Sequence, residues 1–398
     1  MKLAQRVARI KPSATLTINA KAKALKQQGI HIVNFGVGEP DFDTPLNIQE
    51  AGIKAIKEGQ TRYTAVPGID QLRDAICQVI GEDYGLTYAK ENVLVSCGGK
   101  HAIYNMFQAV LDRGDEVIIP SPYWVSYPDM VELTGATPVI VTCPEEDGFK
   151  LKPQALEKAI TSKTRLLILN SPSNPTGVHY RREELAALAE VLIRHEDVMI
   201  LSDDIYYRIL FKGHEWHNIA MVNEKLLDRT FIINGVSKTY CMTGWRIGYL
   251  VGHVDVIRAA SKIQSQSTSN PTSIAQWAAL AALKDDQKGV QEMAKVFEKR
   301  CQYVLDRLAE IPGVTCPAPA GAFYVFPNFS HYYGKKSEKG AIDNSLQLAD
   351  YLMENAHVAV VPGGAFGEDR CLRFSYALSM EDLKEGFDRI SKALKALS

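Results

Sequence analysis

A series of short apolar runs separated by helical patterns constrains the fold of this chain more than any other feature. Seven runs rich in Val, Ile and Leu predict buried strands at Asn92–Cys97, Glu116–Pro120, Thr137–Cys143, Arg165–Asn170, Met199–Asp203, Thr230–Gly235 and Ile247–Gly252. Helical patterns separate several of these runs, at His101–Leu111, Lys152–Ile160 and Arg182–His195. This alternation predicts an α/β fold with a seven-stranded, mostly parallel sheet. Because such sheets bind ligands at the carboxyl ends of their strands, functional side chains are expected just after these runs.

The sequence changes character after Asn270. One long helical stretch is expected from Ile274 to Ile311, where Pro312-Gly313 ends it. The remaining residues combine short strands with a surface loop at Ser330–Gly340 and two helices at Ser345–Asn355 and Met380–Leu397. This pattern predicts a second, smaller α+β domain.

Composition excludes several classes of partner. A net charge of −1 provides no general attraction for nucleic acid or for anionic membranes. The chain has no apolar stretch long enough for a membrane span and no pattern of a signal peptide in its first twenty residues, so a cytoplasmic location is expected. The seven cysteines are scattered without a CxxC pair, which argues against a disulfide framework or a thiolate metal site; no metal is expected.

Two strand ends carry glycines and prolines. The first, Ser96–Lys100, opens a helix with a Gly-Gly turn, where backbone amides and the helix dipole suit a phosphate group, although such turns are often only turns. The second, Asn170–Gly177, contains two prolines within four residues and is either a rigid functional turn or an ordinary polar loop.

Two further strand ends carry charged residues. Ser202–Tyr206 contains two acids, and burial of a carboxylate there requires a cationic partner unless one acid caps a helix. Gly235–Tyr240 contains Lys238, with Arg246 eight residues later; most lysines are solvated, but one at a strand end can be a desolvated nucleophile. A phosphate site, an acid and a reactive lysine together suit pyridoxal phosphate.

Specific motifs then identify a family. The chain resembles the fold-type I, class I/II aminotransferases, and most closely the bacterial aspartate aminotransferases of the subgroup that includes thermophilic enzymes. The resemblance runs from Lys11-Pro12-Ser13-Ala14-Thr15 to the final helix. Its motifs are Gly38-Glu39-Pro40-Asp41-Phe42, Ser121-Pro122-Tyr123-Trp124, Asn174-Pro175-Thr176-Gly177, Ser237-Lys238, Gly244-Trp245-Arg246-Ile247-Gly248 and Arg373-Phe374-Ser375. The resemblance also implies cis peptide bonds at Asn174-Pro175 and Ser121-Pro122.

The resemblance implies how the cofactor's ring is held. Lys238 is expected to bind pyridoxal 5'-phosphate as a Schiff base and to move the substrate proton. Asp203 is expected to pair with the ring nitrogen, while Tyr206 and Asn174 bond the phenolic oxygen of the ring. Trp124 is expected to stack on the ring face.

The phosphate end of the cofactor is implied to lie among Gly99, Lys100, Arg246 and Ser237. Many relatives have a phosphate-binding serine three residues before the lysine, and this chain has Gly235 there. That contact is therefore either absent or replaced by a backbone amide or by Ser237.

Substrate contacts are also implied by the resemblance, at Gly38, Trp124, Asn174, Arg373, Lys100, Ser13 and Thr15. Arg373 is expected to bind the α-carboxylate as a bidentate fork. Many aspartate aminotransferases bind the distal carboxylate with an arginine of the partner subunit, but the matching region Gln264–Asn270 has none. Lys100, helped by the hydroxyl groups of Ser13 and Thr15, is expected to take that role; the alternative is that it only supports the phosphate.

The implied assembly is a homodimer with shared active sites, in which Tyr63 reaches the phosphate of the neighbouring subunit. The expected domains are an N-terminal arm with part of the small domain at 1–46, a large cofactor domain at 47–283 and a small C-terminal domain at 284–398. The expected reaction moves the amino group of aspartate to 2-oxoglutarate through pyridoxamine phosphate. The alternatives are a transaminase of other amino acids (glutamate/prephenate, aromatic or alanine) and a carbon–sulfur lyase that uses the same cofactor.

Overall fold

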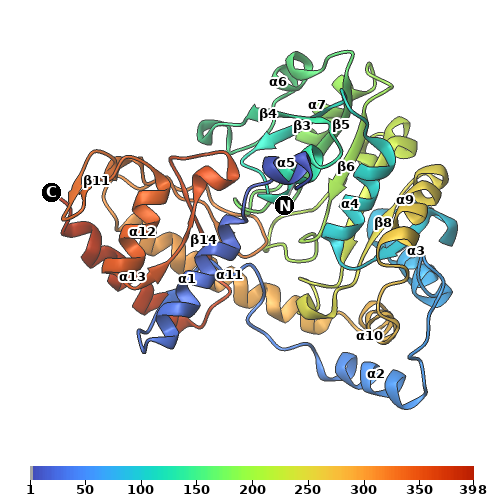
Figure 1. Ribbon diagram of the computed structural model, residues 1–398, viewed down its shortest axis with the longest axis horizontal. Coiled ribbons are helices and arrows are strands. Elements are labelled where there is room, and N and C mark those ends of the chain that lie inside the picture. Colours follow the sequence, from blue (N-terminus) through green and yellow to red (C-terminus); the bar gives the residue numbers. More distant parts are fainter. Residues whose placement is uncertain (1–2) are drawn as a thin grey trace.

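The computed structural model describes residues 3–398 and is an α/β structure with a large sheet on one side and a smaller part on the other (Figure 1). The large sheet has seven strands, in the order β2-β8-β7-β6-β5-β3-β4. Their bounds are β2 (Val93–Ser96), β3 (Glu116–Ser121), β4 (Thr137–Thr142), β5 (Thr164–Asn170), β6 (Met199–Asp203), β7 (Thr230–Gly235) and β8 (Gly248–Val251). All seven expected strands are confirmed. Strand β8 runs opposite to the other six strands, so the sheet is mostly parallel as expected.

Helices cover both faces of this sheet, because the strand residues are apolar on both sides. One face packs against α4 (Gly99–Val110), α5 (Ser126–Glu132) and α9 (Val254–Ser267). The opposite face packs against α3 (Asp70–Tyr84), α6 (Pro153–Ala159), α7 (Arg182–Leu192) and α10 (Ser273–Lys284). The strand register aligns the ends of the central strands, since Asn170 pairs with Asp203 and Asp203 with Ile233. Polar residues that follow these strands therefore gather at one edge.

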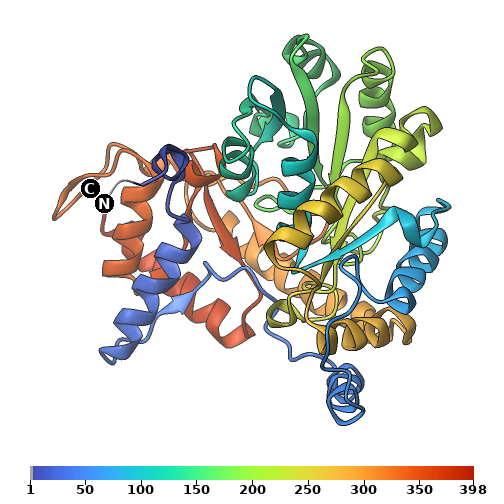
Figure 2. The same ribbon diagram turned by 45° about the vertical axis from the view of Figure 1, so that its right-hand side comes forward.

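The smaller part is built from an N-terminal and a C-terminal segment of the chain, whose helices, blue and red, lie side by side in Figures 1 and 2. Strand β1 (Val33–Asn34) pairs in parallel with β12 (Val358–Ala359). A second small sheet has the order β13-β14-β9, from β13 (Val361–Pro362), β14 (Leu372–Ser375) and β9 (Tyr324–Val325). The helices of the smaller part include α1 (Ala14–Gln27), α12 (Ser345–Asn355) and α13 (Met380–Lys395). The domain boundaries after residues 46 and 283 stay a prediction.

The expected single helix from Ile274 to Ile311 is wrong, because the structure has α10 and a separate helix α11 (Lys288–Ala309). Asp285 adopts an extended conformation, and the carboxylate of Asp286 accepts a hydrogen bond from the backbone amide of Lys288 at 3.1 Å. Aspartate side chains compete in this way for backbone groups and interrupt helices. The expected loop Ser330–Gly340 contains a single 3₁₀ turn and part of a two-stranded hairpin.

Helix α2 (Leu46–Lys57) projects from the large part at the bottom of both views. It packs on α10 with one face, where Gly52 allows the ring of Trp245 to approach closely. Its other face exposes Ile53 and Ile56 to solvent. Among residues 3–398, no helix combines the length and the apolar character that crossing a membrane would require.

Candidate active site

One cavity of about 410 Å³ lies at the carboxyl ends of the central strands, between the large sheet and the smaller part. Every predicted site residue except Tyr63 lines this cavity, namely Ser13, Thr15, Gly38, Gly99, Lys100, Trp124, Asn174, Asp203, Tyr206, Ser237, Lys238, Arg246 and Arg373. Tyr63 lies elsewhere and is 93% exposed. Side chains from distant parts of the sequence thus meet where the sheet topology predicts a ligand site.

One end of the cavity is suited to an anion. Gly98 has φ +88°, and a Cβ atom there would collide with the guanidinium of Arg246. Helix α4 begins at the next residue, so its free backbone amides lie beside a positive charge. Arg246 itself has φ +59° and donates hydrogen bonds to the backbone oxygens of Thr243 and Cys97, at 2.9 and 3.3 Å. This arrangement fits a phosphate group.

Gly235 has a packing role that explains why this chain lacks a serine there. Strands β7 and β8 approach so closely that a Cβ atom would lie 2.9 Å from the Cα atom of Gly248 and from the backbone oxygen of Ile247. The amide of Gly235 is already engaged, since it donates to the side-chain oxygen of Asn234 at 2.8 Å. Ser237, which lines the cavity, is therefore the better candidate for the additional phosphate contact.

Asp203 places a buried carboxylate in the cavity. The hydroxyl of Tyr127 donates to its Oδ2 atom at 2.6 Å, and the amide of Ile205 donates to Oδ1 at 3.3 Å. Burial raises the pKa of Asp203 to about 6, while these hydrogen bonds and the charge of Lys238 oppose the rise. A cation such as a protonated ring nitrogen would stabilise the ionised form. Neither Asp203 nor Asp204 caps a helix, because the residues that follow them form turns.

Lys238 provides an amine in the same cavity. Its Nζ atom donates to the backbone oxygen of Gly38 at 2.6 Å, which connects the lysine to another segment that lines the cavity. Burial lowers the pKa of Lys238 to about 8, although the charge of Glu39 raises it. A neutral amine is therefore accessible near physiological pH, as nucleophilic catalysis requires.

Arg373 is among the largest fully buried side chains of residues 3–398 and is 2% exposed. Its two terminal nitrogens donate to Asn174 Oδ1 at 3.2 Å and to the backbone oxygen of Gly36 at 2.7 Å, and its Nε has no partner. The guanidinium lies over the ring of Tyr324, 4.8 Å from its centroid. Burial lowers the pKa of Arg373, and within residues 3–398 no carboxylate forms an ion pair with it. A buried cation with a free donor is prepared for an anion.

Lys100 and Trp124 lie against each other at the edge of the cavity. The ammonium group of Lys100 lies 4.9 Å from the centroid of the Trp124 ring. Burial lowers the pKa of Lys100, and repulsion from Arg246 lowers it by a smaller amount. The cavity therefore contains a second cation close to an aromatic surface.

The proline-rich turn positions Asn174. Asn170 donates to the backbone oxygen of Asp203 at 2.7 Å and accepts from the amide of Asn174 at 2.9 Å, so the ends of β5 and β6 are tied to this turn. The expected cis bonds at Asn174-Pro175 and Ser121-Pro122 are confirmed, and a third cis bond at Ser171-Pro172 was not expected.

Sequence reasoning missed two tyrosines of the site. Tyr127 lies three residues after Trp124, and the turn that leads into α5 joins the two, since the Tyr127 amide donates to the Trp124 backbone oxygen at 3.0 Å; this spacing was a usable signal. Tyr324, whose hydroxyl lies 3.0 Å from that of Tyr206, comes from the smaller part and had no local signal.

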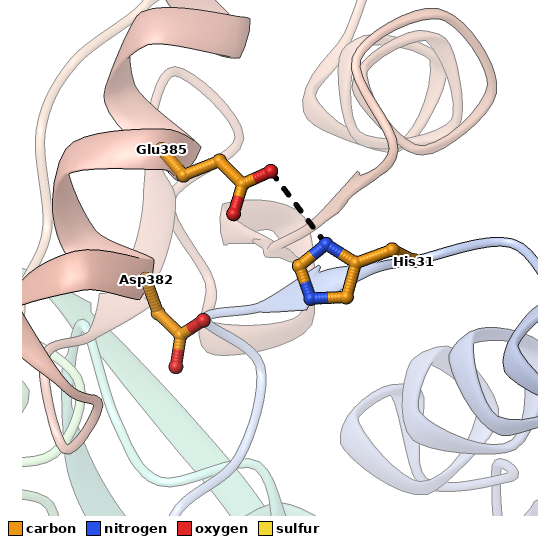
Figure 3. A group of neighbouring side chains, drawn as sticks. All are labelled: His31, Asp382 and Glu385. Carbon is orange, nitrogen blue, oxygen red and sulfur yellow. Dashed lines mark ion pairs between the residues drawn. The ribbon is translucent and has the colours of Figure 1, made fainter.

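One cluster outside the cavity has the side chains of a metal site. His31, Asp382 and Glu385 offer ligand atoms within 4.8 Å of one another, and Figure 3 shows them grouped between β1 and α13. Arg389 already donates to His31 Nδ1 and to Glu385. Because a cation occupies this position and the cluster is largely exposed, its geometry gives no support for a metal ion.

Comparisons with known proteins agree with this geometry. The family model for aminotransferase class I and II matches residues 30–390. An aspartate/prephenate aminotransferase from Cereibacter sphaeroides is 51% identical, over 100% of this chain and 99% of its own. The crystal structure of an aspartate aminotransferase from Rhizobium meliloti matches with a TM-score of 0.97 and 43% identity, covering 100% of both chains. That of a Thermus thermophilus aspartate aminotransferase with maleate has a TM-score of 0.93 and 40% identity, over 99% of this chain and 100% of that one.

Proposed function

Because the chain belongs to the class I and II aminotransferases, we propose that this enzyme transfers the amino group of aspartate to 2-oxoglutarate with pyridoxal 5'-phosphate. The observation that carries the proposal is that, besides Lys238 and the Arg246 of the phosphate end, the cavity holds two cations without a carboxylate partner, Arg373 and Lys100. Two cations suit a substrate with two carboxylates. Relatives named for aspartate support this choice, as does the Thermus thermophilus enzyme with maleate, which is itself a dicarboxylate.

The residues of the cavity fit the proposed cofactor. The phosphate group would lie between the start of α4, Arg246 and Ser237, where a Cβ atom at Gly98 finds no room. Asp203, a buried carboxylate without an arginine partner, would hold a proton on the ring nitrogen. Trp124 offers a ring face for stacking, and Tyr206 and Asn174 offer polar groups for the phenolic oxygen.

Pyridoxal phosphate, when bound, supplies an electron sink for the bond that breaks at the substrate's Cα. Arg373 binds the α-carboxylate and thereby orients that bond. Lys238 Nζ would take the proton from the substrate's Cα and hold it for transfer, a role that its lowered pKa suits. The segment around Gly38, which accepts a hydrogen bond from Lys238, excludes water from the cavity.

The experiment that tests this function is a single-turnover assay. Enzyme loaded with pyridoxal phosphate is mixed with one amino acid at a time, and the loss of its near-visible absorbance is followed. We expect aspartate and glutamate to react fastest. Release of pyruvate and ammonia without any keto acid would instead indicate a lyase.

A second candidate function is favoured by the relative from Cereibacter sphaeroides, which is named for aspartate and prephenate. Prephenate is a dicarboxylic keto acid, so the same two cations can accept it. The test compares prephenate with 2-oxoglutarate as acceptor, with aspartate as the donor. Turnover with 2-oxoglutarate as acceptor but none with prephenate would exclude this second activity.

Lys100 is proposed to select the side-chain carboxylate, and its replacement tests this directly. A charge-assisted hydrogen bond is worth ~1.5–3 kcal/mol, so Lys100→Ala is expected to lower kcat/KM for aspartate roughly ten- to a hundredfold. The value for alanine should change much less. Lys163→Ala, at an exposed lysine, is the matched control and should leave both values unchanged. Equal losses for aspartate and alanine would show that Lys100 serves the cofactor.

Dimerisation is part of the proposal and is supported by the surface of the large part. Tyr63 is 93% exposed, and the exposed apolar residues Ile53 and Ile56 lie on the neighbouring helix α2. A second copy of the chain would cover this surface and receive Tyr63 at its phosphate end. The free cysteines support the proposal of a reducing, cytoplasmic location. We also propose that the large cofactor domain spans residues 47–283.

Hybrid dimers test the role of Tyr63 in the partner's site. Tyr63→Ala and Lys238→Ala are refolded together in equal amounts. If Tyr63 acts across the interface, half of the dimers are hybrids with one intact site each, and activity should recover to about a quarter of wild type. Each variant refolded alone is the control. Recovery no greater than the mean of these controls would place Tyr63 in the site of its own subunit.

A further inference from the structure

The residue after Asp203 is a second buried acid that the proposed chemistry does not use. Asp204, which directly follows β6, is 1% exposed, and its carboxylate bonds Tyr84 of α3, on the face of the sheet opposite the Tyr127 of α5 that bonds Asp203. We propose that Asp204 is a positioning residue, which ties together the strand ends that carry Asp203 and Lys238. This inference rests on the proposed function, since it assumes that these two residues act together.

Three neutral donors surround the carboxylate of Asp204. The hydroxyl of Ser202 donates to Oδ1 at 2.7 Å, and Asn218, just before α8 (Ile219–Val222), donates to Oδ2 at 2.8 Å. The hydroxyl of Tyr84, at the end of α3, donates to Oδ2 at 3.2 Å. Ser202 and Asn218 are near Asp204 in sequence, but Tyr84 is 120 residues away, so its arrival at the same buried carboxylate is a feature of the folded chain.

The hydrogen-bond pattern requires an acceptor at both oxygens of Asp204. The hydroxyl oxygen of Ser202 already accepts from Asn218 at 2.9 Å, and that of Tyr84 accepts from Asn234 at 3.1 Å. Their hydrogens are therefore free to point at Asp204, whose ionised form accepts them. Burial raises the pKa of Asp204 to about 8, and the hydrogen bonds from Ser202, Asn218 and Tyr84 oppose that rise and favour the carboxylate. An asparagine would place an amide donor against these donors. A carboxylate is thus the group that completes the network.

The network continues to the strand that leads to Lys238. Asn234, the next-to-last residue of β7, donates to Tyr84 with its amide nitrogen and accepts from the backbone amide of Gly235 with its oxygen. The amide of Asp204 itself donates to the backbone oxygen of Ile233 at 2.9 Å. The path from Asp204 through Tyr84 to Asn234 therefore bridges the ends of β6 and β7. Lys238 follows four residues after Asn234.

Tyr84→Phe removes one link of this path and keeps the ring. A small displacement of reacting groups can cost about a hundredfold in rate, so we expect kcat for aspartate to fall roughly ten- to a hundredfold. KM should stay within about twofold, because the substrate's carboxylates are held by other residues. Tyr207→Phe is the matched control: its buried ring packs beside that of Tyr84, and its hydroxyl donates to a different carboxylate, Asp83, at 2.6 Å. It should leave kcat within about twofold.

Amide hydrogen exchange of the protein supplied with pyridoxal phosphate gives a readout besides activity. In Tyr84→Phe, and in Asp204→Asn if it folds, amides of Ile233–Lys238 should exchange at least about tenfold faster than in wild type or Tyr207→Phe. Asp204→Glu, which keeps two acceptor oxygens, should restore part of the protection. Equal kcat and equal exchange in Tyr84→Phe and Tyr207→Phe would overturn the proposal. Failure of wild type to bind pyridoxal phosphate would instead reject the proposed function.

Discussion

Lys238→Ala is expected to lower kcat at least about 10⁴-fold, because the variant loses both the amine that binds the cofactor and the group that moves the proton. Lys238 is the lysine whose surroundings depress its pKa to about 8 while it lines the cavity with Asp203 and Arg373. The variant should still fold, since its side chain makes one hydrogen bond, to the backbone of Gly38. The measurement is the rate of keto acid formation from aspartate.

Two controls separate lost chemistry from lost structure. Lys163→Ala, at an exposed position, should retain full activity. Small primary amines added to Lys238→Ala should restore part of the rate, because they can take the proton in place of the side chain.

Borohydride treatment of the loaded wild-type enzyme should fix the cofactor on the peptide that contains Lys238. Recovery of the label on any other lysine would reject the assignment.

The strands could be predicted from sequence because each is a short apolar run with polar residues at both ends. The run before Asp203, Met199–Leu201, is an example, and the structure ends β6 at Asp203. Since parallel strands end at one edge of the sheet, the polar residues after several runs had to meet there. The break between α10 and α11 was missed, because the apolar period continues across Asp285 and only local hydrogen bonds stop the helix.

The different uses of Asp203 and Asp204 could not be predicted from local sequence. A strand period of two separates the faces of the two residues, but it does not say which face holds the cavity. The face was decided by Tyr127 on α5 and by Tyr84 on α3, whose hydroxyls reach the two carboxylates from opposite sides. Such contacts depend on how distant helices pack, and a single sequence does not record that.

Arg373 had a local signal of its own. It stands between Leu372 and Phe374 in an apolar run, where a charged side chain is costly unless an anion compensates it. The structure buries all four residues of β14, so the arginine is held within the protein. Its position opposite the large sheet, by contrast, depends on the pairing of β14 with β9 and β13.

Arg373→Gln is expected to lower kcat/KM about 10²- to 10⁴-fold, because removal of one partner of a buried ion pair costs about 3–5 kcal/mol. The loss should be similar for aspartate and alanine, since both carry the α-carboxylate that Arg373 is proposed to bind. Lys100→Ala, by contrast, should discriminate between these two substrates. The measurement is steady-state kinetics with both amino acids.

Arg373→Lys tests whether the fork or only the charge is needed. Lysine retains the positive charge but presents no planar pair of donors, and it gives up the bonds to Asn174 and Gly36 that fix the guanidinium. We expect an intermediate loss, roughly ten- to a hundredfold, for both substrates. Full activity in Arg373→Lys would mean that charge alone suffices. A loss confined to aspartate would place the side-chain carboxylate, and not the α-carboxylate, at Arg373.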